Sequence, residues 1–145
     1  MRIAIGNDHV GIELKNNLDT FFVEKNIDIM HLGTFNSERM DYPEIGFKIA
    51  ETVSEGKYHS GILICGTGVG MSIVANQVNG IRAAVCSEPY TAKMAREHND
   101  ANILCLGARV IGIEMAKMIL EQWFISEYEG NRHQRRLDMI SGYEK

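Results

Sequence analysis

Residues 61–72 read GILICGTGVGMS, and this stretch decides the fold class. Its apolar residues 62–64 lead into Cys65, and glycines follow at positions 66, 68 and 70. A short apolar run bounded by glycine is typical of a buried strand in a parallel sheet. We expect a helix over residues 69–77 directly after it. The stretch therefore predicts a strand, a tight turn and a helix, the unit from which α/β folds are built.

The same turn is suited to hold an anion. Glycine allows positive φ and a close backbone approach, so successive N–H groups can converge on one ligand. The N-terminus of the predicted helix adds partial positive charge at this place. An ionised Cys65 beside such a site would be a base for proton abstraction. A structural alternative stays open, because free cysteines are among the most buried residues and the turn needs glycine for its own geometry.

The glycine spacing argues against the common nucleotide sites. G-x-G-x-G differs from the dinucleotide pattern G-x-G-x-x-G, and the Lys-Ser/Thr ending of an ATP-binding P-loop is missing. We therefore expect neither a nicotinamide nor an ATP site, and no organic cofactor.

Length and composition place the chain among single-domain globular proteins. Its 145 residues suit one domain, 1–145, with one core, and 45 % are hydrophobic. A net charge of −4 gives no general attraction to nucleic acid or anionic membranes, and no apolar run reaches the roughly 18 residues of a membrane span. Three cysteines without framework spacing indicate a reducing compartment. Because the N-terminus reads directly as a strand rather than as a signal peptide, we expect a cytoplasmic protein.

Short apolar strands alternate with helical patterns along the chain. Strands are predicted at residues 2–6, 27–32, 59–65, 81–86 and 102–106. Helices are predicted at 10–22, from 43 to about 55, at 69–77, 88–98 and 113–124, and from near 131. In the helix at 113–124, Met118, Ile119 and Trp123 are expected on the apolar side. The alternation predicts an α/β fold with a five-stranded parallel sheet, helices on both faces and right-handed crossovers.

Reactive side chains follow several of the predicted strands. In open parallel sheets, ligands bind outside the carboxyl ends of the strands. We therefore expect the polar groups near the strand and helix ends, together with the arginines that share a face of the last helix, to come toward one sheet edge. These are Asp8, His9, Cys65, His98, Asn99, Arg109, Arg132 and Arg136. A phosphorylated small molecule that undergoes proton transfer needs such a set.

Simpler roles remain open for each group. Asp8 could only cap the first helix, and His9 could be a surface residue of its first turn. His98 suits a helix C-terminus when protonated, and a run of arginines is often a solvated face. Cys86 and Cys105 are expected in the core. A metal site is a competing reading, with Asp8, His9, Cys65, His98 and His133 as possible ligands. Because C-x-x-C, H-x-x-x-H and H-E-x-x-H are all missing, we predict no metal.

Six stretches, in this order, carry a resemblance to a known family. They are GNDHVG at 6–11, SERMDYP at 37–43, GILICGTGVG at 61–70, CSEPY at 86–90, EHNDAN at 97–102 and GNRH at 130–133. Over nearly its whole length the chain resembles the type B ribose-5-phosphate isomerases, whose superfamily includes allose- and galactose-6-phosphate isomerases. The resemblance implies a three-layer α/β/α, Rossmann-like domain in at least a dimer.

The resemblance implies catalytic roles. Cys65 looks like the base that moves a proton between C1 and C2 of the sugar. His98 looks like the acid that opens the furanose ring, with Asp8 near the ring oxygen or the hydroxyls. Thr67 would assist ring opening or hydrogen-bond the intermediate.

It also implies binding roles. The enediolate oxygens would be held by the backbone N–H groups of Gly66, Thr67, Gly68, Val69 and Gly70. Asn99 would bind a sugar hydroxyl. The phosphate would be gripped by His9, Arg109, Arg132 and Arg136.

The predicted function is the interconversion of ribose 5-phosphate and ribulose 5-phosphate through an enediolate, a step of the pentose phosphate pathway. The alternatives are an isomerase of allose 6-phosphate or another six-carbon phosphosugar, and a phosphosugar-binding regulator without turnover. Because so short a chain has no lid domain, we expect a dimer or tetramer with shared sites. The partner would supply Arg109 or the His98–Asn99 pair, and Met115, Met118 and Ile119 could serve the interface.

Overall fold

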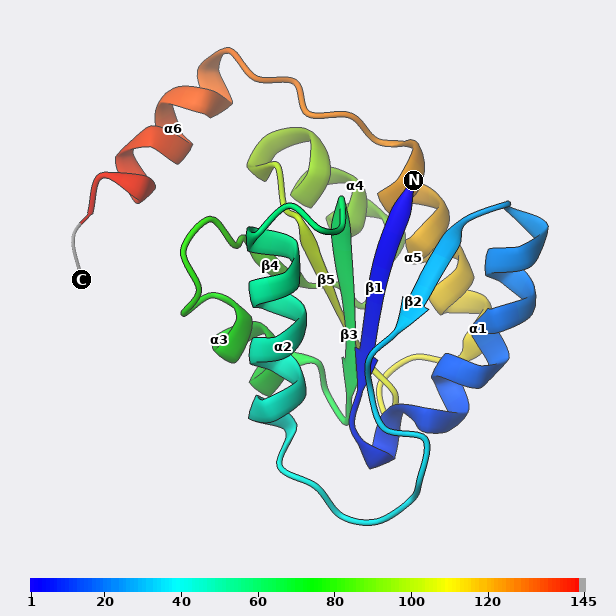
Figure 1. Ribbon diagram of the computed structural model, residues 1–145. Helices are drawn as coiled ribbons and strands as arrows, with labels where there is room; N and C mark the ends of the chain where they lie inside the picture. The colour runs from blue at the N-terminus through cyan, green and yellow to red at the C-terminus, as the bar shows by residue number, and fades with distance from the viewer. Residues whose placement is uncertain (144–145) are drawn as a thin grey trace.

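Five parallel strands form the centre of the computed structural model, which describes residues 1–143 (Figure 1). Their order in the sheet is β2-β1-β3-β5-β4, and every neighbouring pair is parallel. The prediction of a five-stranded parallel sheet is confirmed. The strands are β1 (Arg2–Asn7), β2 (Asp28–His31), β3 (Ser60–Cys65), β4 (Ala83–Val85) and β5 (Ile103–Gly107).

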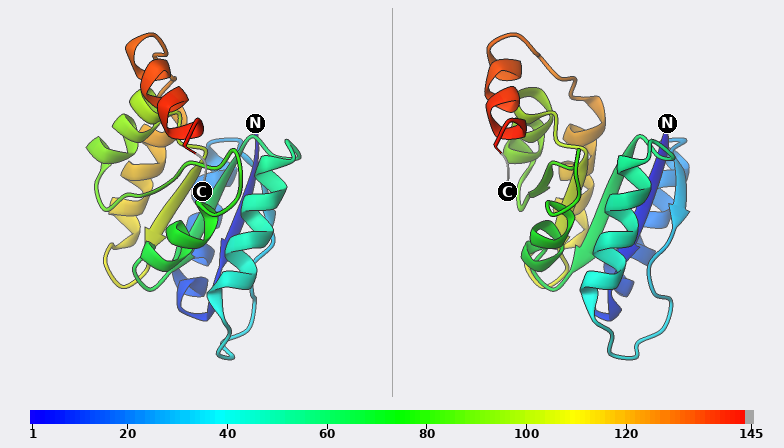
Figure 2. Two further views of the ribbon diagram at one scale, coloured as in Figure 1. Left: turned by 90° about the vertical axis from the view of Figure 1, so that its left-hand side faces the viewer. Right: turned by 60° about the vertical axis from the view of Figure 1, so that its left-hand side comes forward.

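Helices cover both faces of the sheet, which makes three layers. A 3-10 turn, η1 (His9–Gly11), leads into the first helix. On one face α1, α4 and α5 pack against the sheet, and on the other face α2 and α3 do so. The last helix, α6, lies apart from the sheet, beyond the end of α4 (Figures 1 and 2). The helices are α1 (Ile12–Glu24), α2 (Tyr42–Ser54), α3 (Val69–Ala75), α4 (Pro89–Asn99), α5 (Ile113–Ile125) and α6 (Arg132–Ser141).

Successive side chains of the central strand β3 point to opposite faces of the sheet and belong to two different apolar clusters. Ile62 and Ile64 belong to the apolar cluster under α1, α4 and α5. Leu63 and Cys65 belong to the cluster under α2 and α3. Side chains alternate between the faces of a strand, so a fully apolar strand is required where both faces are covered. This alternation sets Cys65 on the α3 side of the sheet.

Differences from the predicted elements are local. The first helix begins with a 3-10 turn because Asp8 Oδ1 accepts hydrogen bonds from Val10 N at 2.9 Å and Gly11 N at 3.1 Å. The prediction for Met118 is wrong: its side chain is 52 % exposed, whereas Ile119 and Trp123 are buried. Successive residues of a helix point about 100° apart, so Met118 faces outward although its neighbour Ile119 faces the core. Among the described helices, none has the length and apolar character to cross a membrane.

Two turns at the carboxyl edge of the sheet are in close contact. A Cβ added to Gly107 would lie 2.8 Å from the carbonyl carbon and oxygen of Thr67. Backbone atoms cannot move aside as a flexible side chain can. The turn after β3 is therefore packed directly on the end of β5.

We expect Gly107→Ala to lower the free energy of unfolding by about 1–3 kcal/mol or more through this overlap. Gly112→Ala is the matched control, because a Cβ there meets nothing within 4 Å and φ is −86°. Gly112 is the N-cap of α5, so its replacement by alanine should lower the free energy of unfolding by at most about 1 kcal/mol. Urea unfolding of both variants measures the difference, and equal losses would contradict close packing of the two turns.

Candidate active site

The thiol of Cys65 lies at the carboxyl edge of the central strand. Cys65 ends β3, and its Sγ accepts a hydrogen bond from Gly68 N at 3.2 Å. Gly68 has a φ of +81° and is the N-cap of α3, a conformation that a residue with a Cβ rarely adopts. Thr67 Oγ1 accepts a hydrogen bond from Val69 N at 3.3 Å. The glycine-rich turn therefore lies against the sulfur, and the predicted order of strand, tight turn and helix is confirmed.

Neighbouring strands bring Asp8, His9 and Arg109 to the same edge. Asp8 N donates to Ile64 O at 3.1 Å, and η1, which contains His9, packs against β3. From the other side, Arg109 N donates to the carbonyl oxygen of Gly66 at 3.0 Å. The Arg109 side chain also lies against this turn, with Cδ 3.7 Å from the position of a Cβ at Gly66. We call this set the thiol half-site: Asp8, His9, Cys65, Gly66, Thr67, Gly68, Val69, Gly70 and Arg109.

One aromatic residue of this edge was missed by the sequence analysis. A Cβ at Gly70 would lie 2.7 Å from a ring carbon of Tyr42 and 2.9 Å from its hydroxyl oxygen. Tyr42 begins α2 and therefore covers the turn from the α2 side. Its only sequence signal was its place in the SERMDYP stretch, because the contact with Gly70 is tertiary.

The expectation that all the polar groups meet at one edge is wrong within a single chain. A helix that follows a parallel strand starts at the carboxyl edge and runs back toward the amino edge. The 11 residues of α4 span about 16 Å in that direction. Asn102, which follows α4, accepts a hydrogen bond at its carbonyl from Gly61 N at 2.9 Å, beside the start of β3. His98 and Asn99 therefore lie at the amino edge, at the upper end of the sheet in Figure 1.

A second cluster forms around His98. Its ring stacks on that of His133, with centroids 4.1 Å apart and planes at 11°. His133 is buried, and its Nε2 lies 3.4 Å from Glu129 Oε2. Arg132 Nη2 lies 3.6 Å from the same carboxylate oxygen. We call this set the histidine half-site: His98, Asn99, Glu129, Arg132, His133 and Arg136.

Charge is unevenly distributed in the histidine half-site. Burial lowers the pKa of His133 below its usual value, and the nearby His98, Arg132 and Arg136 lower it further, while Glu129 raises it. The lowered pKa favours the neutral form of His133.

The possible metal ligands named from the sequence are divided between the two half-sites. Asp8, His9 and Cys65 lie at one edge, and His98 and His133 at the other, so these five residues of one chain cannot share an ion. Among the described residues, His98, Glu129 and His133 place ligand atoms within 4.8 Å of one another. The two imidazole rings of this group are stacked nearly parallel, and Arg132 brings positive charge beside its carboxylate.

An open parallel sheet with a thiol and a glycine-rich turn at its carboxyl edge is the architecture of Rossmann-like α/β proteins, which bind their ligands at this edge. The profile of the family described as Ribose/Galactose Isomerase matches residues 3–140. The chain belongs to this family.

Individual relatives agree with the family assignment. Ribose-5-phosphate isomerase B of Escherichia coli is 50 % identical over 144 residues, which cover 99 % of this chain and 97 % of the relative. The D-erythrulose-4-phosphate isomerase of Pectobacterium atrosepticum is 42 % identical and covers 99 % and 95 %. The structure of Clostridium thermocellum ribose-5-phosphate isomerase B superimposes with a TM-score of 0.95 at 48 % identity, covering 97 % and 95 % of the two chains. The predicted family and the three-layer Rossmann-like fold are confirmed.

The three thiols should differ in reactivity. Burial raises the pKa of Cys86 to about 12 and raises that of the fully buried Cys105 as well. At pH 8 neither forms appreciable thiolate, so iodoacetamide should modify Cys65 first. Peptide mass spectrometry of timed samples measures the order, and Cys65→Ala is the control. Modification of Cys86 or Cys105 at the rate of Cys65 would contradict the assignment.

Proposed function

We propose that this isomerase interconverts ribose 5-phosphate and ribulose 5-phosphate, the substrate class in the names of its relatives. The observation that carries the proposal is the Cys65 thiol beneath the turn of residues 66–70, at the edge where open α/β sheets bind ligands. An aldose–ketose isomerase needs a base that reaches two adjacent carbons, and donors for the oxyanion between them. The thiol half-site offers both.

The proton transfer is assigned to Cys65. Its thiolate takes the proton from C2 of the open-chain aldose and returns it to C1, while a proton passes from O2 to O1. A base with a pKa near the working pH serves removal and return equally well. Backbone N–H groups of residues 66–70, with Thr67, stabilise the enediolate, and loss of one such donor typically costs about a hundred- to a thousandfold in rate.

Ring opening is assigned to His98 and Asp8. His98 donates a proton to the ring oxygen, and Asp8 accepts one from the anomeric hydroxyl. Asn99 binds a sugar hydroxyl. The phosphate is held by His9, Arg109, Arg132 and Arg136, whose binding energy orients the reacting carbons from a distance.

These roles require two chains. In one chain the sheet separates Cys65 from His98, so a complete site needs the thiol half-site of one subunit and the histidine half-site of another. The exposed side chains of Met139 and Ile140 on the outlying α6 support a contact of this helix with a partner. Arg109 lies beside Cys65 in the same chain. The partner's contribution is therefore the His98–Asn99 pair rather than Arg109. A homodimer would hold two such sites.

Two substrates distinguish the proposed role of Cys65 in proton transfer from that of His98 in ring opening. Ribose 5-phosphate is cyclic, whereas erythrose 4-phosphate carries phosphate on the oxygen that would close a furanose and stays open. Cys65→Ala should lose about a hundred- to ten-thousandfold in kcat on both. His98→Asn should lose most of its activity on the five-carbon substrate and change little on the four-carbon one. Coupled assays measure both, and Cys65→Ala with a tenth of the wild-type rate would contradict the base assignment.

The same assays examine the alternatives. A higher kcat/KM of the wild type on allose 6-phosphate than on ribose 5-phosphate would favour the six-carbon function. Binding of both sugars without turnover would favour the regulator.

Dialysis against a strong chelator should leave the rate unchanged.

Subunit mixing examines the two-chain site. Cys65→Ala and His98→Asn subunits are each inactive on ribose 5-phosphate, but a mixed dimer holds one intact site and one doubly altered site. An equal mixture after subunit exchange should recover about a quarter of the wild-type activity, from statistical pairing. If mass spectrometry shows mixed dimers and they remain inactive, Cys65 and His98 act in the same subunit's site.

A further inference from the structure

The end of α4 has an unusual backbone. Asp100 follows the helix with φ 44° and ψ 43°, the left-handed conformation that usually needs glycine. The last carbonyl groups of a helix also lack partners within it. Both features lie directly beside His98 and Asn99, so whatever stabilises this turn also fixes the direction in which the two side chains leave the helix.

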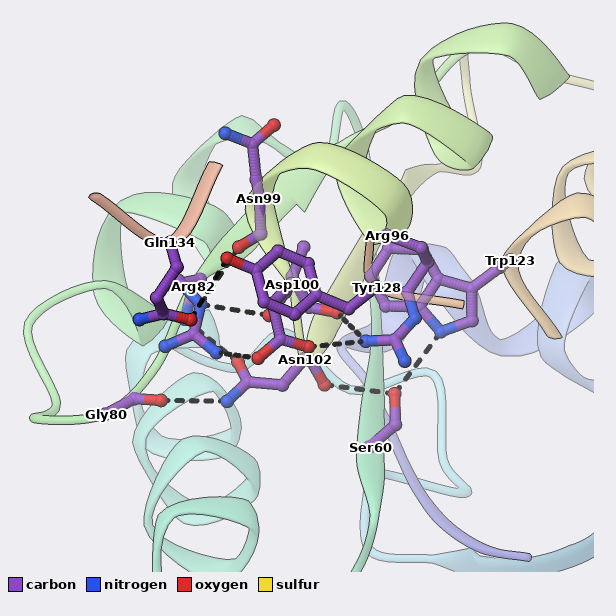
Figure 3. Close-up of polar contacts among 11 residues, drawn as sticks. Ser60, Gly80, Arg82, Arg96, Asn99, Asp100, Asn102, Trp123, Tyr128 and Gln134 are labelled. Carbon is purple, nitrogen blue, oxygen red and sulfur yellow. Dashed lines mark hydrogen bonds and ion pairs between the residues drawn. The ribbon is translucent and has the colours of Figure 1, made fainter. Parts of the chain in front are cut away.

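Arg82 supplies the missing donors from a distant part of the chain. Its Nε donates to the carbonyl oxygens of Asn99 at 3.0 Å and Asp100 at 2.9 Å, and its Nη2 donates to Asp100 Oδ2 at 2.7 Å (Figure 3). One planar guanidinium therefore holds two helix-end carbonyls and the carboxylate of the left-handed residue. The fork of arginine donors makes such simultaneous contacts possible.

The backbone of Arg82 is itself fixed to the other side of the turn. Arg82 N donates to Asn102 Oδ1 at 2.9 Å, and Asn102 N donates to Arg82 O at 3.0 Å. Asn102 O also accepts a hydrogen bond from Ser60 Oγ at 3.0 Å, at the start of β3. The turn is thereby tied to the sheet through Arg82 and Asn102, as Figure 3 shows.

Arg96 contacts the turn at a second point. Its Nη1 donates to Ala101 O at 2.5 Å and lies 3.6 Å from Asp100 Oδ1. Without Arg82, the carbonyls of Asn99 and Asp100 lose the hydrogen bonds from its Nε, and the Asp100 carboxylate loses its shorter ion pair, while the longer contact with Arg96 remains. The left-handed turn would then relax, and Asn99 would move with it.

We propose that Arg82 is a positioning residue for the histidine half-site: through Asn99 and Asp100 it fixes the end of α4 that carries His98 and Asn99. The inference rests on the proposed two-chain isomerase. Arg82 acts through the turn, because its Nε and Nη2 donate to the backbone of Asn99 and Asp100 and to the Asp100 carboxylate. A displacement of about 1 Å in a catalytic group can cost a hundredfold in rate.

Arg82→Gln should therefore lower kcat on ribose 5-phosphate by about ten- to a hundredfold. KM should change by less than about threefold, because the arginines of the phosphate grip remain. Arg82→Lys, which keeps the charge but loses the fork, should be intermediate. Arg2→Gln is the matched control, since Arg2 also pairs with an aspartate, Asp28 at 3.4 Å, but between β1 and β2, on the opposite side of the sheet from β4, which Arg82 precedes. Its kcat should stay at the wild-type level.

Subunit mixing distinguishes positioning from general destabilisation. An Arg82→Gln chain keeps its own thiol half-site, so mixing it with Cys65→Ala chains should restore one intact site per mixed dimer. Mixing it with His98→Asn chains should restore nothing, because both histidine half-sites are then altered. Rescue by both partners, or by neither in verified mixed dimers, would overturn the inference. If Arg82→Gln does not fold, the same two mixtures are made with Arg82→Lys.

Failure of the Arg82 proposal can be distinguished from failure of the proposed isomerase function. Failure of the wild type to isomerise ribose 5-phosphate, or of the Cys65→Ala and His98→Asn mixture to recover activity, counts against the isomerase or its two-chain site. With those controls positive, an Arg82→Gln enzyme with wild-type kcat overturns the positioning role alone.

Discussion

The direction of the strands is the constraint on which the site depends. Because all five strands are parallel, every strand ends at one edge of the sheet and every crossover helix returns to the other. Groups that follow a strand, such as Cys65 and Asp8, gather at the carboxyl edge. Groups that end a helix before a strand, such as His98, gather at the amino edge. No side-chain rotation can bring the two sets together across a covered sheet.

The two edges also differ in how they are built. At the carboxyl edge, backbone amides and tight glycine turns surround the thiol, and the closest contacts are between main-chain atoms of Thr67 and the end of β5. At the amino edge, the basic side chains of Arg132 and Arg136 accompany the stacked rings of His98 and His133, and Arg82 donates hydrogen bonds to the turn that follows His98. Stabilisation of an oxyanion suits fixed dipoles, whereas proton donation suits a side chain. The two edges therefore differ in the groups that they present, although the proposed phosphate grip draws on both.

Local features and the architecture of the sheet were predicted from the sequence, whereas several contacts between distant residues were not. The strand at 60–65 and its turn are specified by apolar residues and glycines that are neighbours in the chain. Met118 was misplaced because one helical step separates an inner from an outer position. The approach of Tyr42 to Gly70 joins residues 28 positions apart, and Arg82 reaches a turn 17 and 18 residues away. The placement of His98 failed for another reason: a motif beside a strand was assigned to the carboxyl edge, although it ends a helix that runs the other way.

The opposed half-sites have a consequence for how the amount of protein controls its activity. A folded single chain would carry every proposed catalytic group and still have no complete site, so activity would appear only as chains associate. By mass action, the active fraction would then rise with total chain concentration around the dissociation constant of the dimer. Dilution would silence the protein while its secondary structure and core remained intact. Fold stability and catalytic competence would thus be governed by two separate equilibria.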